Sequence, residues 1–344
     1  GTGDGGTQYG FEVYNSSSHG ILAGAKTRYL EIDYVEVHNT RNLGIHSKTA
    51  FSEINDANGN GTVREEWVQY GTYIHHSYVH DTGRSGMYIG SSFYDEGKEP
   101  VLEDVEIAYN RIERTGLKGI QVGSATKNVK VHHNVVIDTG LSNINIGSGF
   151  RVGIMVNPGT TGDFYNNIVR NARSDGIYIQ GIGGYRFYNN VIHNSGIASS
   201  SDGIRWALGN NGQFYNNTIV NTNGTGMRVG SWIRGGSIYD NIIAGSTSTD
   251  LSQGNITAFN NLTGSINTLR FVDSASGNFH LRSDSPAVNA GSSTGFAPFD
   301  LDDITRPQGA KADIGAYEFG GAIGPTPTPT PADIKGLLSA YATS

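Results

Sequence analysis

Two columns of side chains flank a glycine that recurs along the chain, and they are the first candidates for chemistry. The glycine opens seven segments of the form glycine, apolar, variable, apolar, at residues 44–47, 86–89, 119–122, 153–156, 176–179, 203–206 and 226–229. The variable place holds His46, Tyr88, Gln121, Met155, Tyr178, Arg205 and Arg228. The place before the glycine holds Leu43, Ser85, Lys118, Val152, Asp175, Asp202 and Thr225. Stacked repeats align equivalent places, so each column predicts one surface.

Four of these residues are candidates for catalysis: Lys118, Asp175, Asp202 and Arg205. The two aspartates follow each other in one column, so their carboxylates could share a proton or bind Ca²⁺. Lys118 could serve as the base that removes a proton next to a uronate carboxylate, provided that its pKa is lowered. Arg205 could hold that carboxylate. The alternatives are a turn for the aspartates, because Asp-Gly is a common turn dipeptide, and a solvated surface position for Lys118.

Tyr88, Gln121, Tyr178 and Arg228 are the candidates for substrate binding. Tyrosine rings can stack on sugar faces, and arginine can bind a uronate carboxylate through two hydrogen bonds. Insertions lie on both sides of the segments, at about residues 48–72, 91–103, 140–151 and 195–201. A flat floor between loop walls predicts a groove that suits a linear polymer, with polysaccharide as the partner.

A second candidate site consists of Asp56, Asn58 and Asn60 in the first insertion. The run from Asp56 to Gly61 resembles the start of a D-x-N-x-N-G calcium loop. The match is partial, because Trp67 stands at the twelfth loop position, where a bidentate glutamate belongs. The run therefore predicts either a Ca²⁺ site or a polar turn, and Ca²⁺ is the one cofactor that the sequence suggests.

Two histidine pairs, at 75–76 and 132–133, are possible metal ligands. We expect residues 108–109 to lie between them, which separates the pairs by about 10 Å, too far for one ion. Exposed positions in a side-chain ladder are the preferred interpretation. A tyrosine column is expected on another face, where it stabilises a sheet or binds glycan: Tyr165, Tyr188, Tyr215 and Tyr239.

These candidates need a scaffold that presents them at a fixed spacing. Six segments align without gaps and end in asparagine at positions 110, 134, 167, 190, 217 and 241, which lie 24, 33, 23, 27 and 24 residues apart. Ser77 and Val35 extend this asparagine column to earlier coils. A basic period of about 23–24 residues, interrupted by insertions, indicates a solenoid. Alternation of apolar and variable residues indicates that each coil consists of short strands.

Such strands must pair with their equivalents one coil away, because no two-residue turns join them into hairpins. The sequence therefore predicts an all-β fold, a right-handed parallel β-helix. Stacked asparagine amides can hydrogen bond to one another and to the turn backbone in such a fold. We expect the asparagine column to hold the fold together and to take no part in chemistry.

The repeats resemble the right-handed parallel β-helix proteins, a group with pectate, alginate and chondroitin lyases and many surface proteins. The resemblance covers roughly residues 10–265 and implies the fold. It does not select a function, because this fold also carries hydrolases, epimerases and adhesins.

The pattern ends at a different string of residues, which spans 271–319 and includes Phe271, Asp300, Arg306 and the run from Asp313 to Glu318. This string is similar to the end segment of bacterial choice-of-anchor Q surface proteins, which implies export and attachment or release at the cell surface. We expect it to cover the open edges of the last coil.

The sequence thus divides into four parts: coils at 1–270, a cap at 271–320, a Pro/Thr linker at 321–331, and a tail at 332–344 that could be a truncated module. We also expect that residues preceded Gly1.

Composition narrows the function further. The net charge of −7, without basic runs, argues against nucleic acid, and no long apolar run suggests membrane insertion. The absence of cysteine excludes disulfides and thiolate catalysis.

Two functions remain for a secreted or cell-surface protein. One is a non-catalytic polysaccharide-binding protein. The other is a lyase or hydrolase of an acidic glycan. The mixed column of Lys, Asp, Arg and Tyr favours the enzyme. Against it, the sequence has no Asp-Asp pair within one motif and no Arg-x-His-Gly signature. The sequence leaves open whether the chain is an enzyme.

Overall fold

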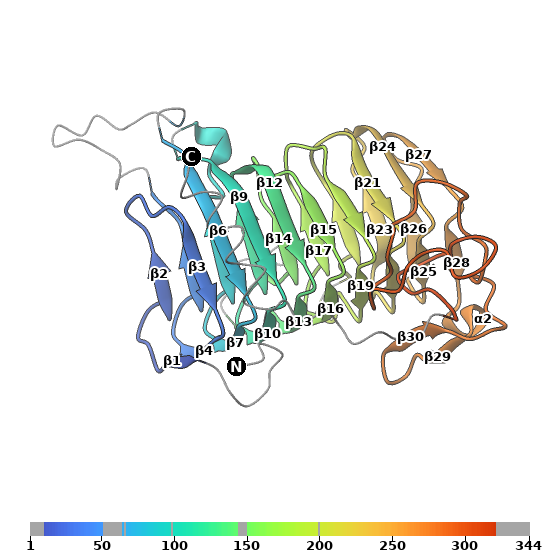
Figure 1. Ribbon diagram of the computed structural model, residues 1–344, viewed down its shortest axis with the longest axis horizontal. Coiled ribbons are helices and arrows are strands. Elements are labelled where there is room, and N and C mark those ends of the chain that lie inside the picture. The colour runs from blue at the N-terminus through green and yellow to red at the C-terminus, as the bar shows by residue number, and fades with distance from the viewer. Residues whose placement is uncertain are drawn as a thin grey trace.

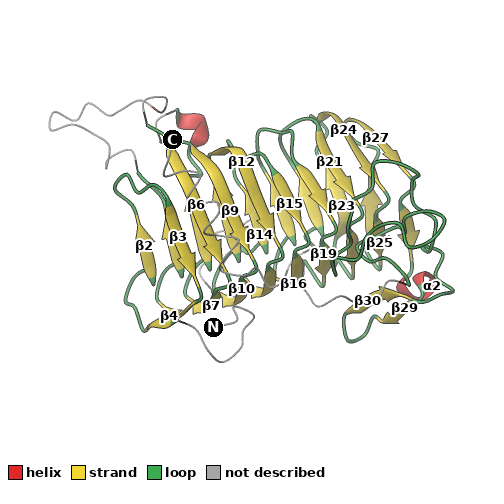
Figure 2. Ribbon diagram, viewed as in Figure 1, coloured by secondary structure: helices red, strands yellow, loops and turns green. Residues whose placement is uncertain are grey.

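A computed structural model of the chain shows the right-handed parallel β-helix that the repeats predict (Figure 1). It describes residues 10–50, 64, 67–97, 99–143, 150–198 and 200–320. The chain winds through three parallel sheets, which we call A, B and C, and Figure 2 shows that strands dominate. Among the described residues, the helices η2 (Tyr94–Glu96) and α2 (Ile266–Leu269) are short. Within the described ranges, no helix is long and apolar enough to span a membrane.

Each strand of the solenoid pairs with its equivalent in the neighbouring coils, so the three sheets run along the axis. Sheet A consists of β1 (Phe11–Tyr14), β4 (Val35–Thr40), β7 (Tyr78–Thr82), β10 (Arg111–Thr115), β13 (Val135–Thr139), β16 (Ile168–Ala172), β19 (Val191–His193), β22 (Thr218–Val220), β25 (Ile242–Ala244) and β28 (Leu262–Gly264). Sheet B consists of β2 (Ile21–Ala23), β5 (Ile45–Ser47), β8 (Met87–Gly90), β11 (Ile120–Gly123), β14 (Ile154–Val156), β17 (Ile177–Ile179), β20 (Ile204–Trp206), β23 (Thr225–Val229) and β26 (Ser248–Asp250). Sheet C consists of β3 (Leu30–Asp33), β6 (Gln69–His75), β9 (Leu102–Ala108), β12 (Ala125–His132), β15 (Asp163–Tyr165), β18 (Arg186–Tyr188), β21 (Gly212–Tyr215), β24 (Arg234–Tyr239) and β27 (Asn255–Phe259).

The core is a column of apolar side chains inside the coils. In β17, Ile177 and Ile179 are fully buried, whereas Tyr178 between them faces outward. The same alternation appears in β5 and β20, because successive side chains of a strand point to opposite faces, whereas β14 and β19 are buried on both faces. The inward-facing apolar residues of all three sheets form one continuous cluster, so the core extends along the axis of the solenoid.

The asparagine column forms the predicted ladder at the corner between sheets C and A. Asn167 Nδ2 donates to Asn190 Oδ1 at 3.0 Å and to the Val131 carbonyl at 2.8 Å, and the Asn167 backbone N–H donates to the same Oδ1. The same contacts join the six predicted asparagines in succession. Ser77 and Val35 occupy the expected places before them. The ladder continues to Asn261, which the alignment of repeats did not include.

The C-terminal segment lies in a different place from the one expected. It starts with a hairpin of β29 (Phe271–Asp273) and β30 (Asn278–Leu281). Phe271, Phe279 and Leu281 are buried with Val191 and Ile242 on the outer face of sheet A. The segment therefore covers the side of the solenoid, as Figure 1 shows, whereas Phe259 in the last coil stays 46% exposed. Burying the apolar outer face of sheet A explains this placement.

Corner residues next to the asparagine ladder fasten the segment over several coils. The side-chain amides of Asn166, Asn189 and Asn216 donate to the backbone carbonyls of Asp300, Phe299 and Asp313, respectively. These three asparagines have left-handed backbone conformations, which asparagine tolerates better than most residues. The segment thus runs back along the coils, and the cap expected over the last coil is a side cover.

Candidate functional site

The outward column of sheet B forms as predicted, but its central residues are buried and only its later residues are exposed. Residues Tyr88, Gln121, Met155, Tyr178, Arg205 and Arg228 face one another in register through consecutive coils. Gln121 is only 4% exposed and Met155 only 7%. Tyr88 is half-buried, and its hydroxyl lies 2.7 Å from Ser92 Oγ. The centre of the column therefore offers a ligand little surface, and the predicted role of Gln121 in binding has no exposed side chain to support it.

The insertions lie where the sequence places them, after β5 and β8 and before β14 and β20. In the insertion before β14, the Phe150 ring lies 4.5 Å from Lys118 Nζ. In the insertion after β8, Tyr94 packs on Gly159 beyond β14, where a Cβ would lie 2.1 Å from the tyrosine ring. Phe150 and Tyr94 thus pack against residues of neighbouring coils, which the repeat pattern does not predict.

An exposed patch remains on β17, β20 and β23, and we call Tyr178, Arg205 and Arg228 the arginine patch. The Arg205 guanidinium carbon lies 5.0 Å from the centre of the Tyr178 ring. The side chains of Arg205 and Arg228 are 45% and 47% exposed. Because the three residues occupy consecutive coils, they follow one another along the axis at about 4.8 Å per coil.

Behind this patch, Asp175 and Asp202 lie in one column, as predicted, but both are buried. The Asp202 backbone N–H donates to Asp175 Oδ1 at 2.7 Å, and the Thr225 backbone N–H donates to Asp202 Oδ1 at 3.1 Å. Arg228 Nε donates to Asp202 Oδ2 at 2.6 Å. Burial raises the pKa of Asp175 to about 6. These contacts fit the turn interpretation, and the proposed Ca²⁺ or proton-sharing role stays a prediction.

Lys118 shares the column of the aspartates, two coils before Asp175, with Val152 between them. It is 6% exposed, so its position is not the solvated surface that was the alternative. Burial, followed by repulsion from Arg84, lowers the pKa of Lys118 to about 8. A lysine with this pKa can act as a base near neutral pH, which is compatible with the predicted catalytic role. The role itself stays a prediction.

The calcium-loop candidates Asp56, Asn58 and Asn60 lie outside the described residues. Their role as Ca²⁺ ligands therefore stays a prediction from the sequence.

The two histidine pairs lie two coils apart with Ala108 between them, as predicted. The expectation that they are exposed is wrong, because His76 is 4% exposed and His132 is 6% exposed. His76 stacks between Tyr34 and Tyr109, with ring centres 5.0 Å apart on both sides. Aromatic stacking along the corner has buried these rings.

The predicted tyrosine column forms a continuous stack on sheet C. Ring centres of Tyr165, Tyr188, Tyr215 and Tyr239 are 4.8, 5.0 and 5.2 Å apart in succession. Ala297 of the C-terminal segment packs on Tyr215 and Tyr239, which leaves little area of these two rings for a sugar, whereas Tyr165 and Tyr188 are half-buried. The stacking fits the predicted role in stabilising the sheet, and glycan binding stays a prediction for the less buried rings.

The sequence analysis missed a polar cluster on the outer face of sheet A, near the N-terminal end of the solenoid. It contains Glu12, Glu36, His38, His80 and Asp81. The signal was present in the alternation of the runs 36–38 and 78–80, in which polar or aromatic side chains flank a valine. Such alternation places the flanking residues on one outer face.

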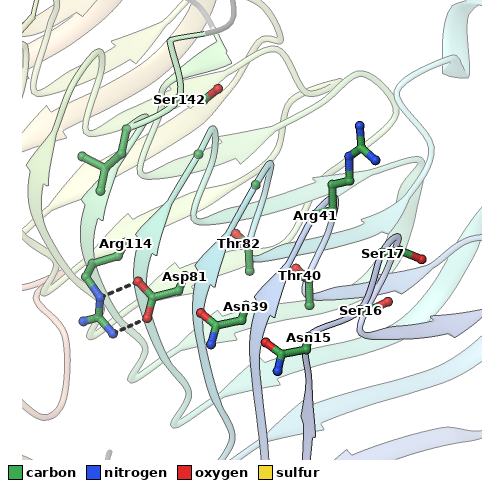
Figure 3. Close-up of a pocket in the computed structure, with 13 residues that line it drawn as sticks. Asn15, Ser16, Ser17, Asn39, Thr40, Arg41, Asp81, Thr82, Arg114 and Ser142 are labelled. Atoms are coloured by element: carbon green, nitrogen blue, oxygen red, sulfur yellow. Dashed lines mark hydrogen bonds and ion pairs between the residues drawn. The ribbon is translucent and has the colours of Figure 1, made fainter.

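Beside this cluster lies an open hollow of about 700 Å³ at the turn from sheet A to sheet B. Figure 3 shows Asn15, Asn39 and Asp81 in one row along its rim, with Arg114 bound to Asp81. Most of its lining residues are polar, and Leu141 is the one large apolar side chain among them.

Comparison with known proteins gives similarity to solved structures only. No protein-family model matches the chain, and no curated protein matches it. The chain is similar to pectate lyase Pel9A, with a TM-score of 0.49 and 12% identity over 91% of this chain and 89% of that one. It is also similar to XylC in a complex with xylose, with a TM-score of 0.45 and 11% identity over 85% and 67%. At such identities, the residues of a site do not carry over.

Proposed function

We propose that the chain is a polysaccharide-binding β-helix protein of the cell exterior, and that the arginine patch binds an acidic glycan. Arg205 carries this proposal. Its guanidinium is exposed, stacks on Tyr178, and lies 4.0 Å from the nearest described carboxylate oxygen, that of Asp175. A guanidinium held in place by a ring, but without a close carboxylate, retains its donors for an anionic ligand.

The order of the patch along the axis suits a polymer. Arg205 and Arg228 are opposite each other in adjacent strands, so two cations follow one another at about the spacing of the coils. Asp202 fixes Arg228 through two hydrogen bonds, at 2.6 and 3.0 Å, while its side chain stays 47% exposed. An acidic polysaccharide that runs along the axis could place successive carboxylates over the two arginines, with a sugar face on Tyr178.

Binding without catalysis is the version that the contacts support best. Asp175 and Asp202 are each 2% exposed, and each accepts a backbone N–H from the next coil. Their positions hold the turn before the glycine-led strand. General acid or base catalysis requires a group within hydrogen-bonding reach of the substrate.

A lyase is the second candidate, and Lys118 is the observation that favours it. Its pKa of about 8 lies below the ordinary value of 10.5, so about a tenth of Lys118 is in the neutral form that a base requires at pH 7. Elimination on a polyuronate produces an unsaturated sugar that absorbs in the ultraviolet. Activity in the wild type that disappears in Lys118→Met, with both proteins folded, would establish the lyase over the non-catalytic proposal.

Affinity electrophoresis through gels that contain acidic or neutral polysaccharides tests the proposed function. We expect retardation by polyuronates that weakens as salt is added, because the contact is ionic. Equal retardation by neutral glycans, or none by any acidic glycan, would contradict the proposal.

A further inference from the structure

The polar cluster on sheet A brings histidine and carboxylate side chains from three coils onto one face. Glu36 and His38 are two residues apart on β4, so they share the outer face. His38 is in register with His80 of β7, and Glu36 is in register with Glu12 of β1. One ligand atom from each of Glu36, His38 and His80 lies within 4.8 Å of the others.

His80 lies between two carboxylates. Its Nδ1 is 2.6 Å from Asp81 Oδ2, and its Nε2 is 3.1 Å from Glu36 Oε1. A neutral imidazole has one N–H, so it can donate to only one of these two oxygens. The other ring nitrogen then presents a lone pair toward a carboxylate, which is unfavourable unless a proton or a metal ion lies between them.

Asp81 and Arg114 fix the position of the His80 ring. Arg114 donates to both oxygens of Asp81 at 2.8 Å. Arg114 Nη2 also lies 3.0 Å from His80 Nδ1. These contacts at Nδ1 direct Nε2 of the same ring toward Glu36. Carboxylates orient metal-binding histidines in this way.

His38 completes the arrangement. Its ring stacks on His80 with centres 4.7 Å apart and planes 4° from parallel. Its Nε2 lies 2.6 Å from Glu12 Oε1, so a second carboxylate is in contact with this ring. The side chains of His38 and His80 are mostly buried, whereas that of Glu12 is half exposed and can move.

We propose that His38, His80 and Glu36 bind a divalent transition-metal ion of the Zn²⁺ class, with Glu12 as the fourth ligand. Two imidazole nitrogens and two carboxylate oxygens suit this ion, whereas Ca²⁺ takes oxygen ligands. Tetrahedral Zn²⁺ with bonds of 2.0–2.1 Å needs ligand atoms about 3.4 Å apart. The His80–Glu36 pair, at 3.1 Å, is close to this value. Glu12 contacts His38 at 2.6 Å but lies outside the group of three, so its exposed side chain must move to complete the coordination.

The proposed ion has a structural role. Its ligands come from β1, β4 and β7, so it fastens the first three strands of sheet A. Four protein ligands leave no open position for a substrate, which is the arrangement of structural zinc sites. The site lies on a different sheet from the arginine patch, and neither proposal depends on the other.

Isothermal titration of Zn²⁺ into metal-free, untagged protein tests the site. We expect one equivalent to bind to the wild type. His80→Phe and His38→Phe keep a stacking ring but remove a ligand, and Glu36→Gln keeps the shape, so each should weaken binding at least about tenfold. His280→Asn is the matched control, because His280 has a carboxylate partner in Asp302 but no second histidine in its site.

Visible absorption of bound Co²⁺ reports the coordination in the wild type, and this part of the test does not depend on the stability of the variants. We expect an intense visible absorption band from the wild type, as four-coordinate Co²⁺ gives, and its loss in His80→Phe. A folded wild type that takes up neither ion, or His38→Phe and His80→Phe variants that bind as tightly as His280→Asn, would overturn the proposal.

Discussion

The Asp202 backbone N–H donates to the carboxylate of Asp175, one coil before it, at 2.7 Å. The Thr225 backbone N–H repeats this contact with Asp202, so a short carboxylate ladder supports the turn before sheet B. The asparagine ladder lies at the other end of the sheet A strands, at the turn from sheet C to sheet A. Both ladders satisfy backbone donors that the turns would otherwise leave unpaired.

Asp175 should make stability depend on pH. Its folded pKa of about 6 lies above its ordinary value of 3.8, chiefly because burial disfavours the charged form. Its contribution is therefore complete below about pH 4 and decreases as the pH rises through 6. Two pKa units correspond to a loss of about 3 kcal/mol.

The comparison with Asp175→Asn isolates this contribution, since asparagine keeps an oxygen for the Asp202 N–H. The unfolding free energies of the wild type and the variant are measured by urea unfolding between pH 4 and pH 7. We expect the wild type to lose stability relative to the variant as the pH rises. A difference that stays constant over this range would show that Asp175 does not titrate there.

The asparagine ladder should be a major source of stability. Asn167→Leu and Asn190→Leu leave buried backbone and amide groups unpaired, so each should lower the unfolding free energy by about 1–3 kcal/mol. Gln213→Leu, on the exposed face of β21, serves as the control and should change little. Denaturant unfolding curves of the ladder variants that coincide with the control would refute the structural role of the ladder.

Calcium remains a prediction from the sequence. If Asp56, Asn58 and Asn60 bind Ca²⁺, the ion should raise the Tm of the wild type, and Asp56→Ala should abolish the rise. Differential scanning calorimetry in chelator and in excess Ca²⁺ provides the comparison. An identical Tm in both conditions would remove this site.

The sequence predicts those features that repeat in every coil. The positions of Asn167 and Asn190, or of Tyr178 and Arg205, follow from one alignment, because stacked units place equivalent residues side by side. The alignment did not include Asn261, because it lies only 20 residues after Asn241 and the coil between them is shorter than the others.

Features made by single insertions or by long-range packing could not be predicted in this way. The burial of Lys118 depends on the insertion that carries Phe150, and no repeat specifies how that loop folds. His38 and His80 are separated in the sequence by an insertion, so their contact follows only from the observed register of β4 with β7. The side cover formed by Phe279 depends on tertiary packing against sheet A.

The central claim is that the arginine patch binds an acidic glycan, and Arg205→Ala tests it most directly. Arg186→Ala is the matched control, because it removes one exposed arginine from sheet C, where Arg186 is paired with Asp163. Both variants change the net charge equally, and both should keep nearly the wild-type Tm, since exposed side chains contribute little stability.

The deciding measurement is isothermal titration calorimetry at low salt, in which a polyuronate oligosaccharide is titrated into the wild type and into both variants. We predict that Arg205→Ala binds at least about tenfold more weakly than the wild type, the effect of losing about 1.4 kcal/mol of charge-assisted hydrogen bonding, whereas Arg186→Ala binds as the wild type does. Equal weakening in both variants, or none in either, would contradict a binding site at Arg205.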